Sequence, residues 1–99
     1  MAVGEINIIP VGTSTPSVSR DIQEAIKVLK ESGLKYEVTA MGTLVEGETR
    51  EILKIAEKMH NSVLGKVLRV VTTIKIDERK DKESSLQSKV KAIVKELSP

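Results

Sequence analysis

The chain has 99 residues, of which 39% are apolar and 30% are charged. Val, Ile and Leu together occupy 30 positions, well above the ~20% below which a charged chain tends to stay disordered. A chain of this length and composition buries enough surface for one modest core, which excludes a two-domain organisation. We therefore expect a single domain spanning residues 1–99.

Several classes of protein are excluded by what the sequence lacks. It contains no Cys, so a disulfide scaffold, a thiolate zinc site and a cysteine nucleophile are excluded. No apolar run approaches the ~20 residues of a membrane span, and the N-terminal stretch has no basic region and carries Glu5, unlike a signal peptide. We expect a cytoplasmic protein that has no membrane partner.

The charge and aromatic content argue against nucleic acid as a partner. The formal net charge is +2, from 16 Lys and Arg against 14 Asp and Glu, which is too balanced to indicate a polyanion-binding surface. Tyr36 is the only aromatic residue, so the base-stacking platforms of RNA-binding strands are missing.

The first half of the chain predicts a strand, a helix and a hairpin. Residues 3–11 are β-branched and alternate, with Glu5, Asn7, Ile9 and Val11 on one side. A turn at residues 12–17 follows, in which Thr15 or Ser17 can cap a helix that has Pro16 in its first turn. An apolar stripe predicts that this helix runs to Gly33. Residues 35–41 and 43–46 then alternate around Gly42 as a hairpin.

The second half predicts a helix, a long strand and a further helix. Thr49 is a plausible cap for a helix whose apolar stripe ends before Gly65. Residues 68–77 give the longest strand pattern, and the charged stretch 77–83 reads as a solvated connection. Ser84 and Gln87 fit a capping box for a C-terminal helix that ends near Leu97.

This element order predicts an α+β fold, the ferredoxin-like βαββαβ sandwich with an extra C-terminal helix. Right-handed crossovers place the two central helices on one face of a four-stranded antiparallel sheet. Half of the residues expected on the other face are aliphatic or Met, which is typical of an interface, so we expect a homo-oligomer assembled there. These residues are Asn7, Ile9, Val11, Thr39, Met41, Leu44, Glu46, Arg69, Val71 and Thr73.

A small-molecule site is expected where the first strand ends. In this topology the turn at residues 12–17, the hairpin and the start of the last strand share one end of the sheet, which brings Thr43 and Arg69 to the turn. Glu46 lies further down the adjacent strand, so hydroxyls, an Arg and a carboxylate could meet in one cleft. The candidate ligand-binding residues are Asn7, Gly12, Thr13, Ser14, Met41, Thr43, Glu46 and Arg69, and the candidate interface residues are Ile9, Val11, Leu44, Val71, Thr73, Asp77 and Arg79.

Each of these features also has a purely structural interpretation. The turn can simply cap a helix, Glu46 and Arg69 can form an ordinary ion pair, and His60 on the flank of a helix is typical of a structural or exposed position. The sequence has one His and no Cys, so a metal site would need carboxylates alone, and no pair of carboxylates shows metal-ligand spacing. The Ser candidates lack a base nearby in sequence, so no catalytic residue and no cofactor is expected.

Three segments together carry a family resemblance: IIPVGTSTPSVS, ESGLKYEVTAMGTLVEGE and RVVTTIKIDERKDK. They resemble the thiamine-binding protein family, in order and with matching spacing over nearly the whole chain. The resemblance implies a ferredoxin-like fold, dimers joined through their sheets and commonly tetramers. It also implies binding of thiamine or its hydroxymethyl aminopyrimidine portion, without an established catalytic activity. The family's hallmark positions fall on Pro10, Gly12, Thr13, Thr43, Glu46, Gly47, Arg69, Asp77 and Arg79.

The leading hypothesis is a non-catalytic oligomeric binder of a thiamine-like ligand. An aminopyrimidine presents a ring-nitrogen acceptor and an exocyclic amine donor, to which hydroxyls and a carboxylate can hydrogen-bond. Glu46 can also balance the positive charge of the thiazolium ring. The alternative is a regulatory or interaction module whose sheet face only assembles subunits and whose small-molecule effector is unrelated. An acyl-phosphate hydrolase is disfavoured, because the first turn offers no Arg before Arg20.

Overall fold

A computed structural model describes residues 1–12, 19–81, 83 and 85–97. The elements follow the order β1 (Ala2–Val11), α1 (Ser19–Ser32), β2 (Lys35–Thr39), β3 (Gly42–Gly47), α2 (Thr49–Leu64), β4 (Arg69–Glu78) and α3 (Leu86–Leu97). This is the predicted βαββαβ order with a further C-terminal helix, and the fold class is confirmed.

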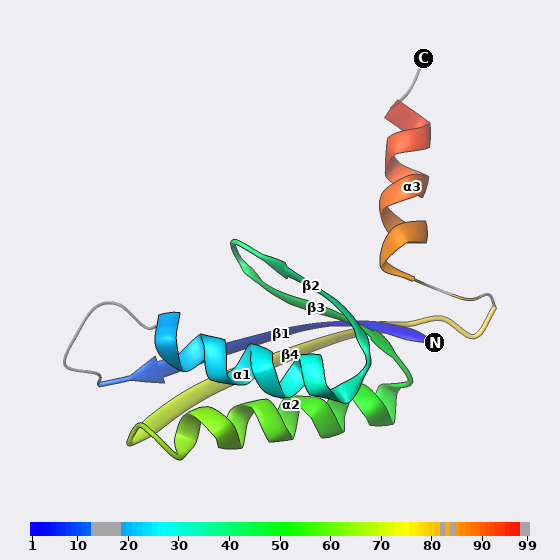
Figure 1. Cartoon of the computed structure of the whole chain (residues 1–99). Coiled ribbons are helices and arrows are strands. Elements are labelled where there is room, and N and C mark those ends of the chain that lie inside the picture. Colours follow the sequence, from blue (N-terminus) through cyan, green and yellow to red (C-terminus); the bar gives the residue numbers. More distant parts are fainter. Residues whose placement is uncertain (13–18, 82, 84, 98–99) are drawn as a thin grey trace.

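The four strands form one antiparallel sheet in the order β2-β3-β1-β4. Helices α1 and α2 lie side by side on one face of the sheet, while α3 rises from the opposite side at the end where β4 finishes (Figure 1). The other face is therefore free of α1 and α2, and we call it the open face.

The core lies between the sheet and the two helices. The sheet contributes alternate residues of β1 such as Ile6 and Ile8, because side chains two apart in a strand share a face. Leu29 of α1 and the stripe of Ile52, Met59 and Val63 on α2 pack against them. Tyr36 lies on this face too, half-buried against the core, as its alternation predicts.

The close approach of α2 to β1 depends on Gly4. A Cβ added at this position would lie 2.8 Å from Cγ2 of the fully buried Ile52, too close to be accommodated without a shift. We expect Gly4→Ala to lower the free energy of unfolding by about 1–3 kcal/mol, as over-packed cores do. Urea unfolding followed by circular dichroism measures this. Gly65→Ala is the control, because its Cβ would meet no atom closer than 3.5 Å and it should unfold like the wild type.

The helix ends observed in the structure agree in part with those predicted from the sequence. Gly33 has a φ of +79°, the left-handed conformation that glycine adopts readily, and it ends α1 as predicted. Thr49 is not the cap of α2, because Glu48 holds that position and Glu51 Oε1 accepts from its backbone N–H at 2.9 Å. For α3, Ser85 and Ser88 each accept a hydrogen bond from the other's backbone N–H at 3.0 Å. The predicted caps Thr15, Ser17 and Ser84 and the predicted first helical residue Pro16 lie outside the described residues.

Candidate functional site

The open face consists of cross-strand rows that follow from the strand register. Residues opposite each other in adjacent strands lie side by side on the same face. From the α3 end towards the other end, the rows are Lys35–Glu46–Val3–Asp77 and Glu37–Leu44–Glu5–Lys75, then the pairs Thr39–Gly42 and Asn7–Thr73, followed by Ile9–Val71 and Val11–Arg69. The first two rows are rich in charge, whereas the Ile9–Val71 row is apolar.

A groove of about 310 Å³ lies over the first two rows, where α3 leaves the sheet. Val3, Leu44 and the backbone of Gly4 line it together with charged side chains of both signs. Those charges are paired: Lys75 Nζ lies 3.7 Å from Glu5 Oε1, and Lys89 of α3 donates to Asp77. The volume is at the small end of ligand sites, which suits one or two small rings.

Glu46 lies next to this groove, as the cross-strand neighbour of Val3. Its side chain is only 13% exposed, and its Oε2 atom is buried with no hydrogen-bond partner among the described residues. Lys35 Nζ is 4.0 Å away, close enough to balance charge but too far to donate a hydrogen bond. A buried carboxylate oxygen in this state is costly, because it has lost water without gaining a donor.

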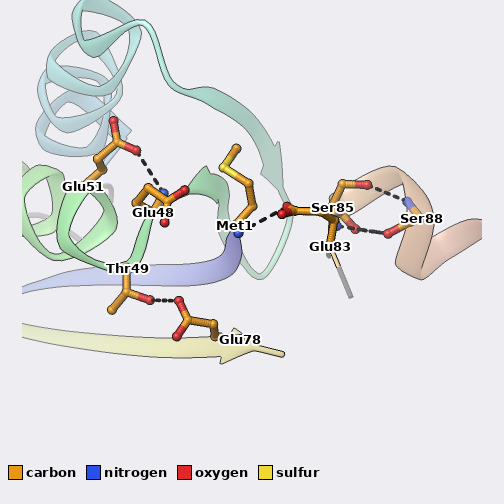
Figure 2. A network of polar contacts seen from close by, with 8 residues as sticks. All are labelled: Met1, Glu48, Thr49, Glu51, Glu78, Glu83, Ser85 and Ser88. Carbon is orange, nitrogen blue, oxygen red and sulfur yellow. Dashed lines mark hydrogen bonds and ion pairs between the residues drawn. The ribbon is translucent and has the colours of Figure 1, made fainter. Parts of the chain in front are cut away.

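Polar contacts fix the start of α3 beside the groove (Figure 2). The Met1 amino group donates to Glu83 Oε2 at 3.3 Å, and this hydrogen bond raises the pKa of the exposed ammonium above its ordinary value. Nearby, Thr49 Oγ1 donates to Glu78 Oε1 at 2.8 Å, which links the start of α2 to the end of β4. The Met1–Glu83 contact joins the segment before α3 to the start of β1, and the Lys89–Asp77 pair joins the first turns of α3 to β4.

The prediction that Thr43 and Glu46 lie close to Arg69 is wrong within one chain. Strand β3 pairs with residues 2–6 of β1, so the hairpin tip stops midway along β1 and does not reach Val11. Thr43 is buried and lies opposite Ile6, on the face that the helices cover. Glu46 and Arg69 lie opposite Val3 and Val11 respectively, which are ~27 Å apart along an extended strand, so they form no ion pair.

The remaining ligand-site predictions fall at the middle of the open face or beyond it. Asn7 is half-buried there, and a Cβ at Gly42 would lie 2.5 Å from Asn7 Oδ1, so a larger residue at position 42 would require the Asn7 amide to move. Met41 is exposed in the hairpin turn, where Thr39 Oγ1 accepts from its backbone N–H at 3.2 Å. Gly12 is exposed at the end of β1 with a φ of +77°, and Thr13 and Ser14 lie outside the described residues.

The predicted interface residues divide into two sets. Ile9 and Val71 form one row and are 54% and 41% exposed, with the half-buried Val11 and the exposed Thr73 nearby. Leu44 is half-buried and lines the groove. Asp77 and Arg79 have partners within the chain: Asp77 accepts from Lys89, and Arg79 Nε donates to Asp81 Oδ1 at 2.8 Å.

Other features of the described chain are structural. His60 Nδ1 lies 2.7 Å from Thr72 Oγ1, which joins α2 to β4 under the sheet. Within residues 1–12, 19–81, 83 and 85–97, no three His, Asp or Glu side chains are grouped closely enough to hold a metal ion. Over the same residues, no helix has the length and apolar content needed to cross a bilayer.

Sequence reasoning did not identify Val3, Lys75 and Lys89 as site residues. The alternation of β1 places Val3 on the same side as Glu5, so the strand pattern carried that signal for Val3. Lys75 faces the same side as Arg69 and Val71, yet nothing in the sequence marks it as part of a groove. The Lys89 contact depends on where α3 lies relative to the sheet, which no local pattern specifies.

The fold and the groove together define a ferredoxin-like protein whose open sheet face carries a small groove with a carboxylate beside it. The chain belongs to the thiamine-binding protein family, whose model matches residues 4–94. It is 50% identical over 91 residues to UPF0045 protein MJ1052 of Methanocaldococcus jannaschii, covering 92% of this chain and 90% of that protein. It is 40% identical to UPF0045 protein YqgV of Bacillus subtilis over the full length of both.

Solved structures give the same fold. The crystal structure of the Methanocaldococcus protein superimposes with a TM-score of 0.89 at 49% identity, covering 94% of this chain and 95% of that one. A Thermotoga maritima protein described as a candidate for thiamine biosynthesis or salvage superimposes with a TM-score of 0.82 at 25% identity. That match covers 93% of this chain and 97% of the Thermotoga chain.

Proposed function

We propose that this protein binds thiamine or its aminopyrimidine portion at the groove beside Glu46, without catalysing a reaction, as a carrier, buffer or sensor. The observation that carries the proposal is the buried Glu46 Oε2, which has no hydrogen-bond partner among the described residues. Glu46 adjoins the groove through its neighbour Val3, and when its side chain turns towards the groove an aminopyrimidine there would supply the missing donor through its exocyclic amine.

The rest of the groove suits the same ligand. Val3 and Leu44 present apolar surface to the ring faces, and Lys75 and Lys89 add donors at the rim for a ring nitrogen. Thiamine also carries a cationic thiazolium ring, whose charge Glu46 can balance, because Asp77 and Glu5 are already paired with Lys89 and Lys75. The family membership and the Thermotoga relative support thiamine chemistry in general, and the geometry of Glu46 supports this position for it.

We further propose that the functional form is a homo-oligomer in which the open faces of two copies pack together. The support is the apolar Ile9–Val71 row, which is exposed in the isolated subunit and continuous with Val11. Exposed apolar surface of this kind is typical of subunit interfaces, and a two-fold pairing buries the same row from both copies at once. Two such dimers would make the tetramer that the family resemblance implies.

Ligand-dependent thermal unfolding tests the binding proposal. A ligand that binds the folded state alone raises the melting temperature, by an amount that grows with its concentration relative to Kd. We expect thiamine and hydroxymethyl aminopyrimidine to raise the melting temperature by several degrees, and the isolated thiazole to leave it unchanged. If no compound bearing the pyrimidine has an effect, the chain is better explained as a regulatory or interaction module that uses its sheet face for assembly.

A further inference from the structure

Helix α3 has an apolar side that its own chain leaves uncovered. Val90, Ile93, Val94 and Leu97, here called the α3 stripe, follow the spacing of a single helix face and are each more than half exposed. Among the described elements, α3 makes its main contacts with β3 and with Asp77 of β4, near its first turns. A helix of 12 residues is marginal in water without packing, so the α3 stripe requires a partner surface.

A second exposed apolar surface lies at the opposite end of the open face. The exposed Ile9 and Val71 and the half-buried Val11, here called the far-end patch, belong to the last two rows of the sheet. Val71 precedes the end of β4 at Glu78 by seven residues, which is ~23 Å along the strand. Helix α3 is ~18 Å long and rises away from the sheet at the Glu78 end, so its stripe cannot cover this patch in the same chain (Figure 1).

A second copy of the chain can cover both the α3 stripe and the far-end patch in one arrangement. When two open faces meet about a two-fold axis with their strands antiparallel, the α3 end of each copy lies at the far end of the other. The projecting helix of one copy then passes beside the far-end patch of its partner, and symmetry repeats the contact. We propose that α3 is an exchanged arm that packs its apolar stripe on the far-end patch of a second copy. This inference rests on the assembly through open faces proposed above.

The exchange has a consequence for the ligand groove. Lys89 lines the groove from the first turns of the same helix that reaches the partner. Docking of the α3 stripe therefore fixes the helix that forms one wall of the site. Assembly and ligand affinity should be coupled through α3, with the oligomer binding more tightly than the free subunit.

Site-directed cross-linking tests the contact in the full-length protein. The chain contains no Cys, so Ile93→Cys and Val71→Cys each introduce a single reactive thiol. We expect a short bismaleimide to give a covalent dimer when both variants are co-expressed in one oligomer, with at least tenfold less from either variant alone. Leu53→Cys replaces Val71→Cys in the control, because Leu53 is an exposed apolar residue on the outer face of α2.

The possible outcomes separate the arm from the assembly. Cross-linking within Ile93→Cys alone, equal to that of the mixed oligomer, would show that α3 pairs with α3 and overturn the proposal. So would the absence of any Ile93–Val71 product in a protein that remains oligomeric by light scattering. As a second measurement, Ile93→Glu should raise the dissociation constant of the oligomer at least tenfold, and an unchanged constant would also overturn the arm. Val71 belongs both to the open face and to the far-end patch, so a Val71→Lys protein that stays oligomeric would overturn the assembly through open faces and the arm together.

Discussion

Val71→Lys should convert the oligomer into free subunits. In the isolated subunit Val71 is 41% exposed at the open face, so a lysine there reaches water and the chain still folds. In a sheet-to-sheet interface the same ammonium is buried without a counter-charge, at a cost of ~3–5 kcal/mol at each copy. The dissociation constant should therefore rise at least a hundredfold. Size-exclusion chromatography with light scattering, over a range of protein concentrations, measures the change in mass.

Leu53→Lys is the matched control for this experiment. It makes the same kind of apolar-to-lysine change at a residue that is 48% exposed, on α2 and away from the open face. The control variant should elute at the wild-type mass. A Val71→Lys protein with wild-type mass at every concentration would contradict assembly through the open face.

Glu46→Gln should weaken binding of the pyrimidine-bearing ligands by roughly 10- to 100-fold. Hydrogen bonds to a charged group contribute ~1.5–3 kcal/mol, and glutamine replaces the charged acceptor by a neutral amide of the same shape. The fold should not suffer, because the substitution removes a buried carboxylate whose Oε2 lacks a hydrogen bond. Titration calorimetry measures affinity, and light scattering of the same sample confirms that the oligomer is intact.

Glu37→Gln provides the control on the same face. Glu37 lies opposite Leu44 in the second row, is exposed, and belongs to the neighbouring strand β2. Its variant should bind the ligand as the wild type does. If Glu46→Gln instead dissociates the oligomer and leaves ligand affinity unchanged, Glu46 is an interface residue and the proposed site is wrong.

The sequence predicted the elements and faces well because burial imposes their periods. Alternation in residues 3–11 placed Ile9 and Val11 on the open face, and Gly33 marked the end of α1. The sequence also placed Glu46 and Leu44 on the open face, where the register of β3 confirms them. These successes share one cause: each depends on which side of an element a residue occupies, and that is a local property.

The errors arose where a position depends on register between distant segments. Thr43 was assigned to the site because the hairpin was expected at the same end of the sheet as the first turn. Its alternation with Leu44, however, places it on the helix-covered face. The pairing of β3 with β1 ends at Thr43 opposite Ile6, which leaves Thr43 far from Arg69. No local sequence pattern specifies where along β1 this pairing ends. The approach of Lys89 to Asp77 likewise depends on where α3 leaves the sheet. The sequence therefore predicted the sheet face on which Glu46 lies, but not the groove wall that Lys89 of α3 supplies.

Titration calorimetry of the wild-type protein with hydroxymethyl aminopyrimidine, thiamine and thiamine diphosphate tests the central proposal most directly. The method suits a chain without Trp, in which intrinsic fluorescence is weak. We expect micromolar or tighter binding of hydroxymethyl aminopyrimidine and thiamine, with one ligand for each chain, because each subunit carries one groove beside Glu46. The diphosphate then shows how far the site accepts added negative charge. An absence of binding heat with all three, at two temperatures, would contradict the assignment of this protein as a binder of thiamine-like ligands.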